Sequence, residues 1–233
     1  MQIKNSVVLI TGGSSGIGKA TAALLAEKGA KVYISGRDVA KLRSVAALIG
    51  AHTIEAPMED DAALEAGMAQ IVNNHGRLDA LINNAGIGEF GPMESVNRET
   101  FRRVFETNVF GAAIAGAIAA KIFMQQRHGN IVNIGSSASL KGFANGSVYS
   151  ASKFALRALS ECWRTELRPY NVRVIQVNPS EVPTAFNRPD RDERLEQANK
   201  LRASDLAYAI VSALEMDDRG FIPELGVWAT NPF

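Results

Sequence analysis

The sequence predicts a Rossmann-type α/β fold, in which a doubly wound parallel sheet of about seven strands carries helices on both faces. Short apolar runs alternate with longer amphipathic stretches along the chain, which is typical of parallel strands joined by right-handed crossovers. A glycine-rich turn follows the first apolar run, as in nucleotide-binding α/β folds. The 233 residues show no linker, internal repeat or second composition regime, so we expect a single domain over residues 1–233.

The first half of the chain is expected to supply strands and helices in strict alternation. The strands are short apolar runs at 7–12, 31–36, 52–56 and 78–86. The helices are longer stretches at 18–29, 38–50 and 60–75. Gly29 is placed to end the first helix and Asp38 to cap the second, because glycine ends helices and aspartate accepts hydrogen bonds from the first turn.

The second half continues the same alternation. Strands are expected at 129–136, 172–179 and 220–228. Helices are expected from about Arg98 to Arg127, from the segment 147–156 to about Arg168, and over 204–215. The first of these helices is expected to bend near Asn108 or Gly111, and Ser204 is expected to cap the last.

The composition argues against nucleic-acid and membrane partners. With 25 basic and 24 acidic residues the net charge is +1, and no basic block is present, so nucleic acid is not an expected partner. The N-terminus lacks the apolar core of a signal peptide. The longest uncharged apolar run, 109–120, is shorter than the ~20 residues of a membrane span. We therefore expect no membrane partner and a cytoplasmic location.

Cysteine and histidine usage predicts neither a disulfide nor a metal site. Cys162 is the one cysteine in the sequence, so it has no internal partner, and we interpret it as a packing residue. The three histidines, His52, His75 and His128, are scattered without metal-ligand spacing.

The glycine-rich turn "TGGSSGIG" (11–18) lies between the first predicted strand and the first predicted helix. Gly12, Gly16 and Gly18 lack Cβ atoms where the chain turns and where phosphates must approach backbone N–H groups. The following helix N-terminus has unpaired donors and the positive end of its dipole, which suit a pyrophosphate. The alternative is a glycine/serine turn without a ligand.

Tyr149 and Lys153 are four residues apart in "SVYSASKFAL" (147–156). Residues at this spacing share one face of a helix. One interpretation is a surface tyrosine resting on a lysine stem. The other is a phenol whose proton is loosened by a fixed positive charge, because a cation stabilises the phenolate and lowers its reference pKa of ~10.

A series of motifs, in order, resembles the short-chain dehydrogenase/reductase family. The turn at 11–18 resembles the family's T-G-x-x-x-G-x-G motif, and "NNAG" (83–86) is similar to its next motif, at a strand end. The remaining matches follow in the family's order: Asn108, Ser136, Tyr149 and Lys153. The resemblance extends from Val7 to about Leu214.

The resemblance implies an enzyme that transfers hydride to a carbonyl, with Tyr149 as general acid in reduction and base in oxidation. Lys153 would lower the pKa of Tyr149 and hydrogen-bond the nicotinamide ribose, while Ser136 would hold the substrate oxygen. Asn108 would distort its helix and position a water that relays protons to Lys153. Charge developing on oxygen requires such donors. Ser137 is a rival for the Ser136 role, and Asn108 alone is also consistent with a mid-helix polar residue without a role.

The end of the second predicted strand indicates the cofactor. A cofactor without a 2′-phosphate is usually held there by an acidic residue, but the family position for that acid is Gly36 here, followed by Arg37. We interpret Asp38 as a helix cap and Gly36–Arg37 as space and a cation for a 2′-phosphate. NADP(H) is therefore the preferred cofactor and NAD(H) the alternative. An exposed Arg37 without a ligand is the plain interpretation, and Ser15, where many relatives carry a second basic residue before Gly16, implies a modest preference.

By the resemblance, the cofactor-binding residues come from four of the predicted strand ends, the first helix and the Tyr149 helix: Gly12, Ser14, Ser15, Gly16, Ile17, Gly18, Arg37, Met58, Asn84, Gly86, Tyr149, Lys153, Pro179, Val182 and Thr184. Pro57 stands where the family delivers an aspartate to the adenine ring, which leaves backbone and Met58 contacts. Ser180 replaces the glycine that usually follows Pro179, which leaves the floor of the substrate pocket undefined.

The sequence does not name the substrate. The segment 184–203 is short, which favours an open pocket, and it is either a lid over the site or a plain exposed connection. The chain ends in "GVWATNPF" instead of the V-D-G-G common among fatty-acid-synthesis reductases of the family. We expect a general NADPH-dependent ketone or aldehyde reductase. The alternatives are a 3-oxoacyl-carrier-protein reductase and, from another class, a non-catalytic NADP-binding regulator.

Self-association is the remaining expectation from the resemblance, as a tetramer or dimer. The small residues of "GAAIAGAIAA" (111–120) and the helix after Tyr149 would let two copies approach closely. The same small residues are equally suited to packing inside one subunit.

Overall fold

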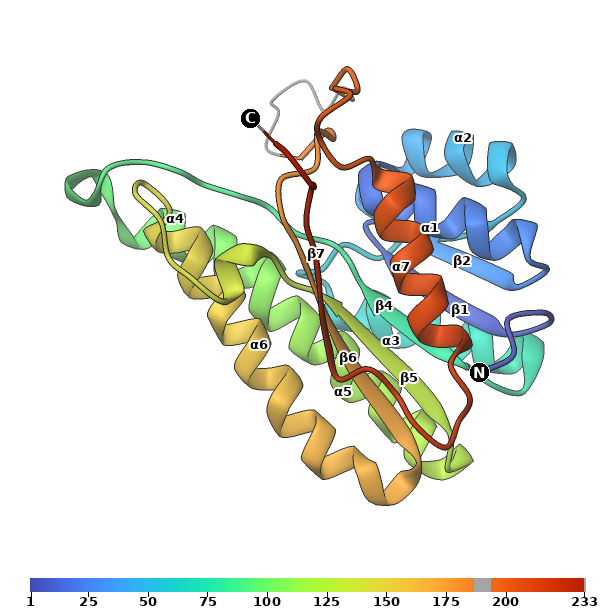
Figure 1. Cartoon of the computed structure of the whole chain (residues 1–233). Coiled ribbons are helices and arrows are strands. Elements are labelled where there is room, and N and C mark those ends of the chain that lie inside the picture. Colours follow the sequence, from blue (N-terminus) through green and yellow to red (C-terminus); the bar gives the residue numbers. More distant parts are fainter. Residues whose placement is uncertain (187–193, 233) are drawn as a thin grey trace.

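The computed structural model describes residues 1–186 and 194–232 and confirms the predicted fold (Figure 1). Within these residues seven strands form one sheet in the order β3-β2-β1-β4-β5-β6-β7, and every neighbouring pair is parallel. The strands are β1 (Val7–Thr11), β2 (Lys31–Ser35), β3 (His52–Ile54), β4 (Ala80–Asn83), β5 (Gly129–Ile134), β6 (Val172–Pro179) and β7 (Glu224–Val227).

The helices join successive strands and cover both faces of the sheet (Figure 1). They are α1 (Gly16–Glu27), α2 (Val39–Ile49), α3 (Asp61–His75), α4 (Arg98–Phe105), α5 (Ala112–Gln126), α6 (Ser147–Leu167) and α7 (Ala203–Glu215). Asp38 caps α2 as predicted, because its carboxylate accepts from the backbone N–H of Lys41 at 3.0 Å. Gly29 follows the end of α1 with a left-handed φ of 84°.

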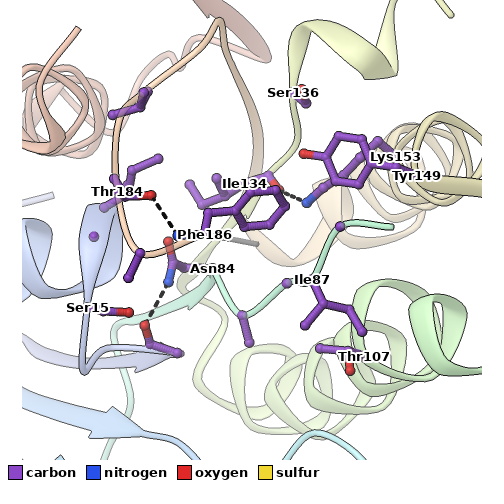
Figure 2. A pocket seen from close by; sticks show the side chains of 18 of the residues that line it. Ser15, Asn84, Ile87, Thr107, Ile134, Ser136, Tyr149, Lys153, Thr184 and Phe186 are labelled. Atoms are coloured by element: carbon purple, nitrogen blue, oxygen red, sulfur yellow. Dashed lines mark hydrogen bonds between the residues drawn. The ribbon is translucent and has the colours of Figure 1, made fainter. Parts of the chain in front are cut away.

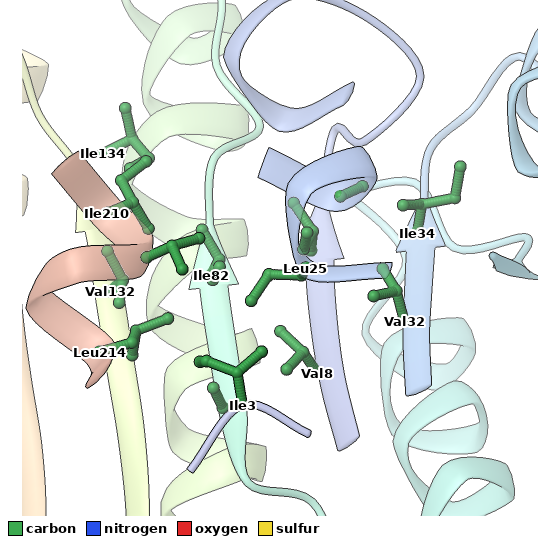
Figure 3. Packing of buried hydrophobic residues seen from close by; sticks show 14 of the residues in the cluster. Ile3, Val8, Leu25, Val32, Ile34, Ile82, Val132, Ile134, Ile210 and Leu214 are labelled. Atoms are coloured by element: carbon green, nitrogen blue, oxygen red, sulfur yellow. The ribbon is translucent and has the colours of Figure 1, made fainter. Parts of the chain in front are cut away.

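The core consists of two apolar layers, one on each face of the sheet. Alternate residues of β1 point to opposite faces, so Val8 and Ile10 join one layer and Val7 and Leu9 the other. The first layer lies under α1, α2 and α7 and contains Leu25, with the neighbours drawn in Figure 3. The second layer lies under α3, α5 and α6. Both faces are therefore closed to water, as an all-parallel sheet requires.

The strand order places a crevice between β1 and β4. The chain runs outward from β1 to β3 and then returns to β4 on the other side of β1. Connections at this reversal leave in opposite directions, so the carboxyl ends of β1 and β4 open a gap in which α/β proteins bind ligands. The glycine-rich turn follows β1, and Asn84 follows β4.

The expected bend near Asn108 and Gly111 is a π-helical turn, Glu106–Gly111, between α4 and α5. A Cβ atom on Gly111 would lie 2.4 Å from the carbonyl oxygen of Met58, so the turn packs directly on the backbone that follows β3. Single π-helical turns inside α-helices are frequent at functional sites. The distortion is thus explained by close packing at Gly111 and by the hydrogen bonds of Asn108 described below.

The combined segment Arg98–Gln126 has the length and mean hydropathy, 1.5, of a membrane-spanning helix. In the described structure its α5 part packs against β4, β5 and α3, and 44% of its most apolar window is buried. We therefore interpret it as a core helix of the α/β fold.

Two expectations were wrong. The last helix begins at Ala203, so Ser204 is not its cap; the Asp205 carboxylate accepts from the Arg202 N–H at 2.8 Å instead. Cys162 is exposed on α6 and is not a packing residue. Gly116 of the small-residue run lies against the Trp163 ring of the same subunit, where an added Cβ would be 2.8 Å away. Ala117 of the same run is exposed, so a contact of this helix with a second copy stays a prediction.

Candidate active site

One cavity of about 1080 Å³ opens at the carboxyl ends of the strands. Its walls include fifteen of the predicted site residues: Gly12, Ser14, Ser15, Gly16, Ile17, Arg37, Met58, Asn84, Gly86, Ser136, Tyr149, Lys153, Pro179, Val182 and Thr184. Figure 2 shows side chains from the β1, β4, β5 and α6 segments converging on this space. Two predicted residues, Gly18 and Asn108, do not line it.

The glycine-rich turn leaves the cradle that a dinucleotide pyrophosphate requires. Gly12 and Gly16 adopt φ angles of 65° and 52°, which L side chains rarely adopt. A Cβ on Gly12 would lie 2.8 Å from the Cα of Ala85. No acidic residue occupies the first turn of α1, so no negative charge competes there with an anion at the helix N-terminus. The residues present therefore fit a nicotinamide dinucleotide.

Gly18 has a packing role beneath the turn. A Cβ there would lie 2.4 Å from Nδ2 of Asn84. Asn84 donates from this nitrogen to the carbonyl oxygens of Thr11 and Gly12, both at 3.0 Å. The "NNAG" motif thus holds the glycine-rich turn against the end of β4.

Tyr149 projects from the first turn of α6 into the cavity and is only 8% exposed. Ser136 follows β5, lines the same cavity and lies near enough to Tyr149 for its side chain to lower the tyrosine pKa. Burial raises the pKa of Tyr149, and the Ser136 side chain offsets part of that rise. This proximity favours Ser136 over its rival Ser137, although Ser137 also lines the cavity.

Lys153 lies one helical turn further along α6 and is 4% exposed. Its Nζ donates to the carbonyl oxygen of Ile134 at 2.8 Å (Figure 2) and is 5.8 Å from the centroid of the Tyr149 ring. Burial lowers the pKa of Lys153 to about 8. The largest effect on the Tyr149 pKa is burial, and its direction is opposite to the shift expected from Lys153.

Asn108 is 1% exposed and lies behind the cavity wall. Its Oδ1 accepts from the Ile87 N–H at 2.8 Å, and its Nδ2 donates to the Ile87 carbonyl at 2.9 Å and to Ser152 Oγ at 3.0 Å. A Cβ added to Gly86 would lie 3.4 Å from Asn108 Oδ1 and 3.5 Å from Lys153 Nζ. In the described structure Asn108 therefore anchors the loop after β4 beside Lys153.

The end of the cavity near β2 has the space and the cation that were expected for a 2′-phosphate. Gly36 and Arg37 both line it, and Arg37 is exposed. A Cβ on Gly36 would lie 3.9 Å from Ser14 Oγ, so the glycine-rich turn faces this position. Asp38 also lines the cavity, but its carboxylate accepts from the first turn of α2.

The sequence-based predictions missed an aromatic wall beside Tyr149. Phe90, Phe143 and Phe186 line the cavity, and all three lie outside the regular helices and strands. Hydrophobic periodicity identifies residues of helices and strands, so it carries no signal for such loop residues. Only the convergence of three loops reveals them.

The predicted lid, 184–203, lies partly outside the described residues, which exclude 187–193. On its near side Thr184 and Phe186 line the cavity. On its far side Lys200 pairs with Glu181 at 2.8 Å. Across the described part of the chain, no group of three or more His, Cys, Asp or Glu side chains is arranged to hold a metal ion.

The family model described as short chain dehydrogenase matches residues 6–195 of the chain. The chain belongs to the short-chain dehydrogenase/reductase family. This dehydrogenase/reductase is 35% identical over 207 residues to an uncharacterized oxidoreductase of Listeria monocytogenes, a match that covers 84% of this chain and 82% of the relative.

Two solved structures of this family share its fold over nearly the whole chain. The 3-ketoacyl-(acyl-carrier-protein) reductase of Brucella melitensis, complexed with NADH, is 27% identical with a TM-score of 0.88, over 99% of this chain and 100% of the other. A metagenomic short-chain oxidoreductase in complex with NADP is 29% identical with a TM-score of 0.84, over 97% of this chain and 98% of the other. The dehydrogenase/reductase described here is accordingly an oxidoreductase that acts on CH–OH groups with a nicotinamide cofactor.

Proposed function

We propose that this dehydrogenase/reductase reduces a ketone or aldehyde to an alcohol with NADPH, and that Tyr149 is the general acid. One observation carries the proposal: the buried Tyr149 side chain shares one cavity with Ser136, Lys153 and the glycine-rich turn. A proton donor and a second hydroxyl therefore meet where the carboxyl ends of the strands bind the cofactor. When bound, the nicotinamide supplies a hydride to the carbonyl carbon.

The residues of this chain then bind and protonate the carbonyl oxygen. Ser136 donates a hydrogen bond to it and Tyr149 transfers its proton, so that the developing alkoxide leaves as an alcohol. Tyr149 becomes a phenolate at this step. Lys153, whose pKa is about 8, is protonated at neutral pH and stabilises that phenolate until Tyr149 is reprotonated. In alcohol oxidation the same proton moves in the opposite direction.

The preference for NADPH is part of the proposal. Residue 36 carries no carboxylate to hold a free ribose 2′-hydroxyl, and the exposed Arg37 at the cavity rim is a cation for a 2′-phosphate. NAD(H) is the alternative cofactor. The lid at 184–203 and the cytoplasmic location remain predictions.

The test of the function is oxidation of NADPH and NADH against ketones, aldehydes and thioesters, with Tyr149→Phe as the critical variant. We expect turnover to fall by about 10²–10⁴-fold, as removal of a general acid does, with unchanged NADPH binding. Tyr208→Phe is the matched control, because Tyr208 is 71% exposed on α7. This variant enzyme should keep the wild-type turnover. A Tyr149→Phe enzyme with wild-type turnover would refute the proposed role of Tyr149.

A 3-oxoacyl-carrier-protein reductase is the second candidate, and the Brucella structure with this activity in its name favours it through 99% coverage of the chain. Faster turnover of acetoacetyl thioesters than of simple ketones would select it. If NADPH bound tightly but no carbonyl compound in the panel reacted, a non-catalytic NADP-binding regulator would replace both.

A further inference from the structure

The substrate side of the cavity is walled by aromatic rings beside the Tyr149 ring. The Phe90 ring meets the Tyr149 ring edge to face, with centroids 5.3 Å apart. Phe186 lies 5.7 Å from Tyr149, and Phe143 lies 6.0 Å from Phe90. In Figure 2 the Phe186 ring projects into the pocket beside Tyr149 and Lys153. Two phenylalanines thus lie against Tyr149 and a third lies against Phe90, each from a different loop.

The chain makes room for these rings with glycines. A Cβ on Gly88 would lie 2.9 Å from both the Phe186 and the Phe90 ring, and one on Gly146 would lie 2.6 Å from the Phe143 ring. The Gly91 N–H donates to the Asn145 carbonyl at 2.9 Å, which joins the loop of Phe90 to the loop of Phe143. The aromatic wall is therefore held in place by its backbone.

Two of the rings remain uncovered although they line a cavity. Phe90 is 44% exposed and Phe143 is 50% exposed. Aromatic faces left open beside a proton donor are best covered by a planar aromatic group, which can stack or meet them edge to face at the separations seen between the rings themselves. A flexible acyl chain gains burial there but not this ring geometry.

We infer that the enzyme selects carbonyl compounds whose C=O is attached to an aromatic ring, and that Phe90 and Phe143 set this preference. The inference rests on the proposed carbonyl reduction. The aromatic ring of the substrate lies against Phe90 and Phe143, which directs its carbonyl oxygen toward Tyr149 and Ser136. No further reactant is needed, because the hydride and the proton have the sources already given.

The test compares acetophenone with cyclohexyl methyl ketone, which has the same carbon skeleton but a puckered, saturated ring. Their intrinsic reactivities differ, so the measured quantity is the ratio of their kcat/KM values, compared between enzymes. We expect the acetophenone preference to fall by about tenfold in the Phe90→Leu/Phe143→Leu double variant, since leucine keeps the apolar surface but loses the ring geometry. Tyr208→Leu, a change far from the cavity on α7, should leave the ratio unchanged.

A ratio that changes less than about twofold in the double variant, with both ketones still reduced, would overturn the inference and leave the proposed function standing. If the wild-type enzyme reduces neither ketone nor any other carbonyl compound of the panel, the proposed function fails and binding decides the inference. Titration of 2-acetylnaphthalene into the NADP⁺-saturated protein, followed by ligand fluorescence, should then show binding that weakens in the double variant. No binding, or equal binding by both proteins, would overturn it.

Discussion

At the scale of single residues, the site combines two buried groups whose ionisation is costly. Lys153 is 4% exposed and its pKa is lowered to about 8 by burial, while burial raises the pKa of Tyr149. Both shifts disfavour charge, so the tyrosine is held as a neutral phenol. A proton donor that stays protonated until a substrate and cofactor arrive suits carbonyl reduction.

Lys153→Met should abolish turnover yet raise stability at neutral pH. The pKa of Lys153 in the folded protein lies below its unfolded value of 10.5. Between pH 10.5 and about 8 the unfolded chain therefore binds a proton that the folded protein does not, and the free energy of unfolding falls as the pH is lowered across this range. The cost in the free energy of unfolding is at most about 3 kcal/mol. The variant should therefore gain most below pH 8, and its advantage should shrink as pH rises from 8 to 10.5, in urea unfolding at a series of pH values.

The control for this experiment is Lys121→Met, an exposed lysine on α5, for which we expect no pH-dependent difference. A Lys153→Met protein that is less stable than wild type by the same amount at every pH would show that the ammonium is not penalised by burial.

Arg37→Ala tests the cofactor preference at the other end of the cavity. Loss of a charge-assisted hydrogen bond to a 2′-phosphate costs about 1.5–3 kcal/mol, so kcat/KM for NADPH should fall by about tenfold or more. The kcat/KM for NADH should be unchanged, because NADH has no 2′-phosphate. Equal losses with both cofactors would contradict a 2′-phosphate contact.

At the scale of elements, the strands under Ser136 are joined by a buried polar chain. Asn133 donates to Ser160 Oγ at 2.8 Å, Ser160 donates to Gln176 at 2.7 Å, and Gln176 donates to Asn178 at 3.0 Å. This chain links β5, α6 and β6 directly below the residue that precedes Ser136. Satisfied buried networks of this kind specify one arrangement of their elements.

Gly135→Ala should disrupt that arrangement. An added Cβ would lie 2.0 Å from Gln176 Nε2 and 2.3 Å from Asn178 Oδ1, so the network or β5 must shift. We expect a loss of about 1–3 kcal/mol in urea unfolding, as overpacking of a core produces, together with reduced kcat because Ser136 moves. Gly142→Ala is the matched control, since no atom lies within 4 Å of its Cβ; a stability loss no greater than that of this control would contradict the packing argument.

At the scale of the whole molecule, the outer surface of the α4–α6 region carries apolar groups that the small-residue run does not explain. Phe110 is 52% exposed on the π-helical turn, and Phe154 is 42% exposed on α6, which contacts that turn. These two rings are the basis on which we propose self-association as a dimer or tetramer. Exposed apolar patches commonly mark such interfaces.

The double variant Phe110→Glu/Phe154→Glu should shift the protein to monomers in light scattering coupled to size-exclusion chromatography, because two carboxylates per copy would be buried against each other at the interface. Tyr208→Glu, at an exposed site on α7, should leave the assembly unchanged. A wild-type protein that is monomeric at the same concentration would refute the proposed interface.

Local spacing was sufficient to predict the alternating fold, the glycine-rich turn and the Tyr149–Lys153 pair, because each depends on residues a few positions apart. A strand–turn–helix junction requires glycines where the backbone approaches a ligand closely. Side chains four residues apart lie on the same face of a helix. The helix cap at Asp38 followed from the same kind of short-range rule. Ser204 did not, because the Arg202 N–H donates to the Asp205 carboxylate and the cap position lies at Arg202, two residues earlier.

Burial and the meeting of distant loops were decided by the tertiary structure alone. The sign of the Tyr149 pKa shift depends on how much water α6 and the loops exclude, and the aromatic wall depends on three loops converging from residues 90, 143 and 186. Asn108 was predicted from order, yet its partners Ile87 and Ser152 are 21 and 44 residues away. Desolvation of a side chain and contacts between distant residues depend on the whole folded chain, so they cannot be predicted from a short stretch of sequence.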